Sequence, residues 1–282
     1  MFKELELNDY KQQIADMYSR RSHNYDESEW HTRITHRLVE LAQISSGQQV
    51  LDIATGTGHI AIEVAQIVGS SGRVVGVDIS TGMLDQARRK VEALNLSNVE
   101  LILADAEALL FPTNSFDRIL CANSFPWIAD MEAALRQWMR LLKPDGLIGI
   151  HTPADTAYVV DVVLRELFEK YGVILASSKP AGTVEKCHNL LERAGFEAIK
   201  IQSEQYGGSY ISLEQAKQRL TGNSYPGFVQ FSNLQSPLSS EQLEQVKAEF
   251  YAQLEALATE QGIWNDGTNF FVVGRKSADS IS

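Results

Sequence analysis

The stretch Val50-Leu-Asp-Ile-Ala-Thr-Gly-Thr-Gly58 decides the fold of this 282-residue chain. Its first four residues are typical of a buried strand, and a segment with helical spacing follows the two glycines at 59–68. Because Gly56 and Gly58 lack a Cβ atom, the loop backbone can approach a ligand closely. The free N–H groups of the helix's first turn face the same ligand. The stretch therefore predicts a ligand-binding loop between a strand and a helix.

The composition indicates a globular protein that is not a general nucleic-acid binder. Hydrophobic residues make up 44% of the chain and charged residues 22%, which excludes disordered and fibrous classes. A net charge of −11 disfavours a surface that displaces counterions from phosphates. The sequence contains no apolar run of the ~18 residues that a membrane span needs and no signal-peptide core near its start, which predicts a cytoplasmic location. Cys121 and Cys187 lack the spacing of a zinc or redox site, and no histidine and carboxylate spacing predicts a metal.

Strands and helices alternate from residue 50 onward. The predicted strands are 50–53, 73–78, 99–103, 116–121, 147–151, 198–203 and 269–275. This alternation predicts an α/β fold with a doubly wound, Rossmann-like, seven-stranded and mostly parallel sheet, with helices on both faces. Ligands in such sheets bind outside the carboxyl ends of the strands.

Two segments fall outside this alternation. Residues 1–45 are expected to form a helical N-terminal arm, and residues 205–268, with helices predicted at 213–220 and 240–259, to form a helical lid inserted between two strands. The core would then comprise residues 46–204 and 269–276.

The glycine loop alone leaves two cofactors open. Residues 56–61 satisfy GxGxxG/A, and Asp78 lies where a dinucleotide fold places its ribose-binding acid, so an NAD(P)-dependent oxidoreductase is one interpretation. Asp52 favours another, because a carboxylate at the mouth of the loop repels a pyrophosphate and attracts an ammonium and a sulfonium. S-adenosylmethionine carries both cations and no phosphate.

Several further motifs follow in order. They are Val74-Val-Gly-Val-Asp-Ile-Ser80 with Met83, Ala104-Asp-Ala-Glu107, Ser115-Phe-Asp-Arg-Ile119, Leu141-Leu-Lys-Pro-Asp-Gly-Leu147 and Leu191-Glu-Arg-Ala-Gly-Phe196. With the glycine loop they resemble the class I S-adenosylmethionine-dependent methyltransferases, in the branch similar to the ubiquinone/menaquinone methyltransferases. The resemblance covers roughly residues 47–203 and rests on several motifs at the right spacing.

The resemblance implies a set of cofactor-binding residues. The methionine moiety would be held by Asp52, Ala54, Thr55 and the Gly56–Gly58 backbone, with Asn123 near the sulfonium. Asp78 would bind the ribose hydroxyls, and Tyr25 would lie over the cofactor. Adenine would pack on Ile79 and Met83, with its edge bound by Asp105 and the Ala106 N–H. Asp78 and Asp105 have an alternative interpretation as caps of the next helix or turn.

The acceptor side is less defined. Phe125 and Trp127 follow the fourth predicted strand, where they would line the acceptor or belong to the core. His151 ends the fifth strand and is a candidate catalytic base and acceptor contact, with a structural role as the alternative. Tyr18 of the arm and Tyr206 and Tyr225 of the lid are further candidates for contact with the acceptor. For the lid aromatics, packing in the lid's own core is the alternative.

The sequence therefore predicts a biosynthetic methyltransferase that uses S-adenosylmethionine. It would transfer a methyl group by in-line displacement to O, N or C of a small, apolar or aromatic metabolite, without a nucleic-acid partner, as a monomer or homodimer. An oxidoreductase and a noncatalytic S-adenosylmethionine-binding scaffold are the alternatives.

Overall fold

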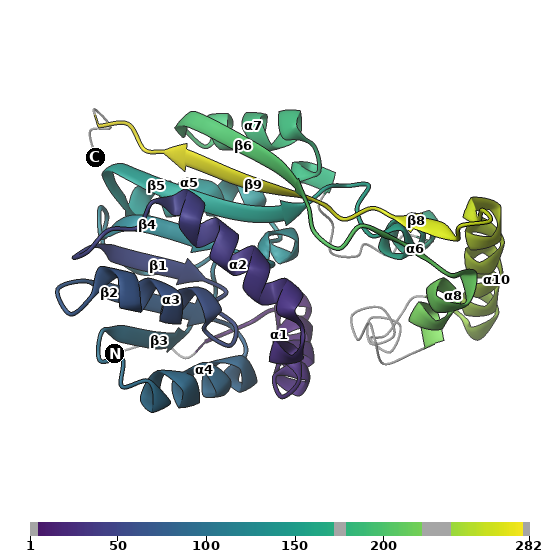
Figure 1. Ribbon diagram of the computed structural model, residues 1–282, viewed down its shortest axis with the longest axis horizontal. Helices are drawn as coiled ribbons and strands as arrows, with labels where there is room; N and C mark the ends of the chain where they lie inside the picture. The colour runs from purple at the N-terminus through teal and green to yellow at the C-terminus, as the bar shows by residue number, and fades with distance from the viewer. Residues whose placement is uncertain (1–4, 172–178, 222–237, 279–282) are drawn as a thin grey trace.

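A central sheet organises the molecule. The computed structural model describes residues 5–171, 179–221 and 238–278. Within these ranges seven strands form one sheet in the order β3-β2-β1-β4-β5-β9-β6 (Figure 1). They are β1 (Gln49–Ile53), β2 (Arg73–Asp78), β3 (Val99–Leu103), β4 (Phe116–Cys121), β5 (Leu142–Pro153), β6 (Glu197–Gln205) and β9 (Thr268–Arg275). The strands from β3 to β5 pair in parallel, and β9 is antiparallel to β5 and β6. The predicted seven-stranded, mostly parallel sheet is confirmed.

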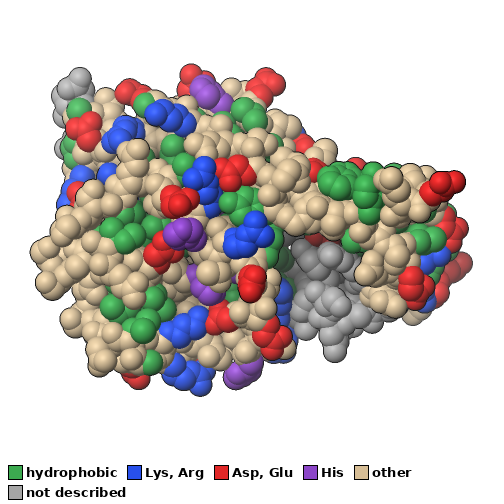
Figure 2. Space-filling model, viewed as in Figure 1, with side chains coloured by type: hydrophobic (Ala, Val, Ile, Leu, Met, Phe, Trp, Pro, Cys, Tyr) green, Lys and Arg blue, Asp and Glu red, His purple; other side chains and the backbone are tan. Residues whose placement is uncertain are grey.

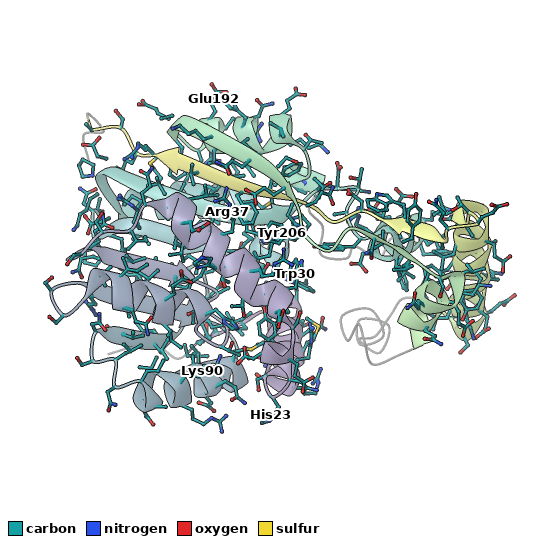
Figure 3. The ribbon with its side chains drawn as sticks, in the orientation of Figure 1. His23, Trp30, Arg37, Lys90, Glu192 and Tyr206 are labelled. Carbon is teal, nitrogen blue, oxygen red and sulfur yellow. The ribbon has the colours of Figure 1, made fainter. Side chains whose placement is uncertain are left out.

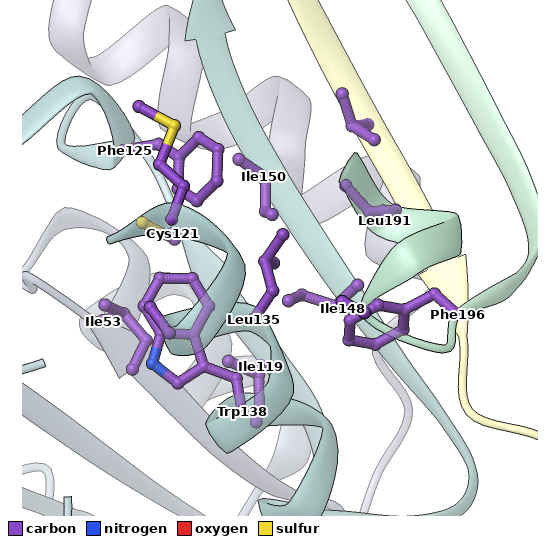
Figure 4. Packing of buried hydrophobic residues seen from close by; sticks show 14 of the residues in the cluster. Ile53, Ile119, Cys121, Phe125, Leu135, Trp138, Ile148, Ile150, Leu191 and Phe196 are labelled. Carbon is purple, nitrogen blue, oxygen red and sulfur yellow. The ribbon is translucent and has the colours of Figure 1, made fainter. Parts of the chain in front are cut away.

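Helices cover both faces of this sheet. Because side chains alternate along each strand, successive residues of a strand pack on opposite faces. On β1, Val50 joins a buried cluster with α2 (Glu29–Ala42) and α3 (His59–Val68). Leu51 and Ile53 join the other cluster, beside Trp138 of α5 (Met131–Leu141) and Leu191 of α7 (Val184–Arg193) (Figure 4). Helix α4 (Thr81–Ala93) contacts β2 and β3. The central parallel strands are thus buried on both sides, whereas the antiparallel edge strand β6 is largely exposed.

The fifth strand begins earlier than predicted. It was expected at 147–151, after a helix stopped by proline and glycine, but β5 starts at Leu142. Phe116 pairs with Leu142 and Arg118 with Leu147, so residues 143–146 form an irregularity in the strand. A bulge accommodates proline and glycine without ending the strand.

The N-terminal arm packs along the carboxyl edge of the sheet. Helix α1 (Asp9–Arg21) is capped by the Asn8 side chain and contacts α4, and a short 3-10 helix, η1 (Tyr25–Glu27), leads into α2. The contact is close: a Cβ on Gly82 would lie 2.8 Å from the Ser19 Cα. The arm is therefore docked on the core and is not a free extension.

A second, smaller unit projects from the core, and we call it the extension (Figure 1). It comprises α6 (Val159–Lys170), β7 (Ser209–Ile211), α8 (Leu213–Thr221), α10 (Ser240–Leu257) and β8 (Ile263–Asn265). Its apolar core joins Leu167 of α6 to Phe250 and Leu254 of α10. Helix α6 therefore packs with residues 205–268, and the antiparallel β7–β8 pair makes this block less purely helical than expected. None of the helices in the described ranges is long and apolar enough to cross a membrane.

Candidate functional site

The loop that joins β1 to α3 contains left-handed backbone conformations. Ala54, Gly56 and Gly58 have φ angles of 52°, 56° and 88°, a region that glycine adopts freely and alanine does not. The Thr55 N–H donates to the Val77 carbonyl at 2.9 Å, which ties the loop to β2. Strained residues of this kind are typical of functional loops.

Asp52 lies behind this loop. It is 1% exposed, and the Thr55 hydroxyl donates to its Oδ2 at 2.5 Å. Burial, with a further contribution from the charge of Asp78, raises the pKa of Asp52 to about 7. The carboxylate of Asp78 is therefore close enough to affect the pKa of Asp52.

Asp78 ends β2 and connects two backbone segments. Its Oδ2 accepts from the Gly56 N–H and its Oδ1 from the Ser80 N–H, each at 2.8 Å. Burial raises the pKa of Asp78 to about 6, although these hydrogen bonds act in the opposite direction. Described residues form no ion pair with either Asp52 or Asp78, so this corner of the site is suited to a cationic ligand.

A largely apolar pocket opens in front of the loop, between the arm and the carboxyl edge of the sheet. Residues that line it are Lys11, Ile14, Tyr18, Tyr25, Ala54, Gly56, Val77, Asp78, Ile79, Ser80, Met83, Ala104, Asp105, Ala106, Glu107, Ala122, Asn123, Ser124, Trp127 and Ile128. Nine predicted cofactor residues are among them: Tyr25, Ala54, Gly56, Asp78, Ile79, Met83, Asp105, Ala106 and Asn123. Asp52, Thr55 and Gly58 are not in this lining.

One end of the pocket is closed by a lysine of the arm. Lys11 Nζ lies 2.7 Å from Asp105 Oδ2 and 2.9 Å from a Glu107 oxygen, and all three side chains are largely buried. Burial lowers the pKa of Lys11, but its hydrogen bonds to the two carboxylates outweigh burial and raise it overall. Asp105 Oδ1 also accepts from the Glu107 N–H at 2.9 Å. No motif selects Lys11, although its spacing from Ile14 and Tyr18 places all three on one face of α1.

The other end of the arm is bound to the glycine loop. Asp26 accepts from the Thr57 hydroxyl at 2.6 Å and lies 2.8 Å from His59 Nε2 and 2.5 Å from Lys90 Nζ. Burial acts to raise the pKa of Asp26, but Lys90 and Thr57 hold it below its usual value. Tyr25, the neighbour of Asp26, is thereby fixed at the pocket wall. The arm is anchored on both sides of the pocket.

Five rings form what we call the aromatic row: Trp127, Tyr18, Tyr25, His31 and Trp30. Successive ring centroids are 5.9, 6.3, 4.1 and 5.1 Å apart. Trp127, Tyr18 and Tyr25 line the pocket, and the row continues beyond it to Trp30 on α2 (Figure 3). Tyr18 and Trp127, predicted on the acceptor side, therefore lie together.

His151 lies outside the pocket lining, fully buried at the edge of the row. Its Nδ1 accepts from the Asn123 N–H at 3.2 Å, and this assigns the proton to Nε2, which lies 2.9 Å from Asn269 Oδ1. Burial lowers the pKa of His151 to about 4. Because both ring nitrogens are engaged, the geometry favours the structural alternative: His151 links β4, β5 and β9. Asn269, which the sequence reasoning missed, gave no motif signal.

Two further candidates, Phe125 and Tyr206, do not lie in the pocket lining. Phe125 is 1% exposed and packs against Trp138. It therefore belongs to the core, which was the alternative to a place beside the acceptor. Tyr206 contacts Phe271 and Arg33 on the flank of α2 (Figure 3). Tyr225 falls outside the described residues.

Asn123 offers a test of the pocket against a cationic ligand. It follows β4 with a φ of 58°, and its side-chain Oδ1 is buried without a hydrogen-bond partner. An unpaired buried acceptor is costly unless a ligand supplies a donor. An ammonium group supplies such a donor, and its charge is favourable at the carboxylate side of the pocket, where Asp78 lies. Within the described ranges, no group of three His, Cys, Asp or Glu residues has the geometry to hold a metal.

Known proteins share both the sequence motifs and the fold. A family model described as "Methyltransferase domain" matches residues 50–146. Aklanonic acid methyltransferase DauC of Streptomyces sp. is 30% identical over 66% of this chain and 87% of its own length. Ubiquinone/menaquinone biosynthesis C-methyltransferase UbiE of Cronobacter sakazakii is 38% identical over 52% of this chain and 62% of its own. The fold is shared with phosphoethanolamine N-methyltransferase 2 of Haemonchus contortus, solved in a complex with S-adenosylhomocysteine, with a TM-score of 0.61 and 18% identity. This likeness covers 96% of this chain and 61% of that one.

These relatives decide between the two cofactors that the glycine loop left open. The dinucleotide interpretation is set aside, and with it the oxidoreductase alternative. The chain belongs to the class I S-adenosylmethionine-dependent methyltransferases, in the branch similar to the ubiquinone/menaquinone methyltransferases, and S-adenosylmethionine is its cofactor.

Proposed function

We propose that this methyltransferase acts on O, N or C of a small, apolar or aromatic metabolite. The observation that carries the proposal is the aromatic row, which begins at the cofactor pocket and continues past it to Trp30. Stacked and edge-on rings suit a flat, apolar acceptor. Relatives named for aklanonic acid and for ubiquinone/menaquinone biosynthesis support the same class of acceptor.

The cofactor roles of individual residues are part of this proposal. Asp78 would accept from the ribose hydroxyls, Ile79 and Met83 would pack on adenine, and Asp105 with the Ala106 N–H would bind the adenine edge. The Asn123 Oδ1 and the loop backbone at Ala54, Thr55, Gly56 and Gly58 would face the methionine moiety. Tyr25 would present its ring to the cationic end, where a ring face is favourable. Asp52 would act from behind the loop through its charge.

Catalysis in this scheme depends mainly on positioning. S-adenosylmethionine supplies a methyl group that is already activated by its sulfonium. The chain's own work is to hold the acceptor atom about 3 Å from the methyl carbon, in line with sulfur, and to exclude water. The anchors at Lys11 and Asp26 hold the arm over the pocket for this purpose. His151 would hold Asn123 in place and not remove a proton.

The division into an arm (1–45), a core (46–204 and 269–276) and a lid (205–268) also belongs to the proposal. In support, α8 contacts α10 and β7 pairs with β8 among the described residues of the lid range, and α6 of the core range packs on the same apolar cluster. Acidic and basic side chains are interspersed on the face shown in Figure 2, without a broad basic area for nucleic acid. The cytoplasmic location and the monomeric or homodimeric state stay predictions.

Turnover with matched acceptors tests this proposal. Production of S-adenosylhomocysteine, measured by mass spectrometry, is expected with 2-naphthol, 1,4-naphthalenediol or aniline and not with ethanolamine. Trp127→Ala should raise KM for the aromatic acceptor about tenfold or more, because it removes a ring from the pocket wall. Trp264→Ala, at a half-exposed ring of β8, is the control and should leave KM unchanged. If the enzyme turned over ethanolamine and none of the aromatic compounds, this result would contradict the proposal of an aromatic acceptor.

A further inference from the structure

Arg165 of α6 is a buried cation that none of the roles above uses. It is 6% exposed, and its one hydrogen bond to a described residue runs from Nη2 to the Asp155 carbonyl, at 2.9 Å. Its Nε is buried without a partner. No ion pair found within the described ranges includes Arg165. Most of the hydrogen-bonding capacity of this guanidinium is therefore unused.

Such an arrangement is unfavourable unless an anion completes it. Guanidinium keeps its proton in proteins and carries five N–H donors, so it cannot avoid the cost of burial by becoming neutral. A buried charge without a partner is strongly destabilising. Glu169, one turn further along α6, pairs with Lys179 at 2.6 Å instead. The sequence of residues 172–178 and 222–237 contains no Asp or Glu. The missing anion is thus not supplied by these parts of the chain.

The carboxylate of Asp155, the residue that contacts Arg165, is engaged by another cation. Asp155, whose carbonyl accepts from Arg165, uses its carboxylate to pair with Lys186 at 3.0 Å. The Asp155 N–H donates to the Gly182 carbonyl at 2.9 Å, just before the Thr183-capped start of α7. The Asp155 carboxylate is therefore engaged by Lys186, next to the positive end of a helix, and Arg165 receives only the backbone carbonyl of this residue.

The same loop connects Arg165 to the acceptor side of the site. Asp155 comes two residues after the carboxyl end of β5. Three residues later, the Tyr158 ring lies 6.2 Å from Trp30, at the end of the aromatic row, and its hydroxyl lies 3.2 Å from Asn269 Nδ2. The guanidinium therefore contacts the loop between β5 and α6, and the same loop carries Tyr158 at the end of the aromatic row.

We propose that Arg165 binds a carboxylate of the acceptor, at a position remote from the atom that is methylated. The free Nε–H and neighbouring N–H groups of a guanidinium match a carboxylate in a two-pronged contact. The acceptor is then an aromatic acid, with its rings along the aromatic row and its acid group at Arg165. This inference rests on the proposed function, because it extends that acceptor site.

Ligand-induced thermal stabilisation tests the inference with a matched pair of probes. The full chain, saturated with S-adenosylhomocysteine, is heated with 6-hydroxy-2-naphthoate, whose hydroxyl and carboxylate lie at opposite ends of the ring system, or with 2-naphthol, which lacks the carboxylate. The naphthoate is expected to raise the melting temperature more than the naphthol at concentrations up to about 10 mM. Arg165→Met should abolish this difference. Lys170→Met, on the same helix at an exposed pair with Glu249, should retain it.

Each outcome decides the question. Equal responses of wild type to the two probes, or a preference for naphthoate that survives in Arg165→Met, would overturn the carboxylate site. Should Arg165→Met fail to fold, Arg165→Lys keeps the charge without the two-pronged contact, and undiminished preference for naphthoate in it would overturn the site as well. Failure of S-adenosylhomocysteine itself to stabilise wild type would instead contradict the proposed function.

Discussion

Replacement of Asp52 by asparagine should make the stability of the free enzyme less sensitive to pH. The pKa of Asp52 rises from its ordinary 3.8 to about 7 on burial. A carboxyl group whose pKa is raised by folding stabilises the folded state fully at pH values below the pKa that it has in the unfolded chain. This stabilisation is lost as the pH rises through the pKa that the group has in the folded protein. Between pH 5 and pH 7 the wild type therefore loses stability at 1.36 kcal/mol per pH unit, or about 3 kcal/mol, as an order-of-magnitude figure. Asparagine does not ionise and keeps an oxygen that can accept from Thr55.

Urea unfolding of the wild type and Asp52→Asn at pH 5 and pH 8 measures this difference. The variant should gain about 3 kcal/mol relative to the wild type between the two pH values. Asp85→Asn, at an exposed carboxylate of α4 that pairs with Arg88, is the control and should show little change. A stability difference between Asp52→Asn and wild type that stays constant with pH would refute the reasoning. S-adenosylmethionine should also stabilise the wild type more than the variant at pH 8, because the ionised carboxylate attracts its cations.

Two further variants test the arm and the buried histidine. Lys11→Met should speed the dissociation of S-adenosylhomocysteine about 5- to 30-fold in stopped-flow experiments. The reason is that it removes a largely buried contact with Asp105 and Glu107 that is worth roughly 1–2 kcal/mol. An unchanged dissociation rate would argue against an anchored arm. His151→Gln should lower kcat by less than about tenfold, since an amide can replace both hydrogen bonds of a neutral ring. A loss of a thousandfold or more would instead support a general base.

The sheet could be predicted because its signals are local. The apolar runs of β1 and β2, the glycine loop and the spacing of the helices each occupy a few consecutive residues. The three-residue strands β7 and β8 carry no comparable pattern, and their pairing, which brings Tyr210 against Trp264, joins residues distant in sequence. The early start of β5 depends on its pairing with Phe116, which is also a contact distant in sequence.

The candidate site divides in the same way. Motif residues such as Asp78 and Asn123 line the pocket, since Asp78 ends β2 and Asn123 comes two residues after β4, and the carboxyl ends of both strands are at the site. Lys11 and Asn269 were missed because their partners lie 94 and 118 residues away. Arg165 was missed for a related reason: its lack of a counter-ion is a property of the packed chain and leaves no pattern in the sequence.

Calorimetric titration of the wild type and of Asp78→Asn with S-adenosylhomocysteine tests the central claim most directly. The claim is that the pocket in front of the glycine loop holds the cofactor, with Asp78 on its ribose. The wild type should bind one equivalent, and NAD should give no heat. The variant should bind about 30-fold more weakly or worse, because it loses a charged acceptor of hydroxyl hydrogen bonds, worth roughly 2 kcal/mol or more. Equal affinity of the two proteins for S-adenosylhomocysteine, or competition by NAD, would contradict the account.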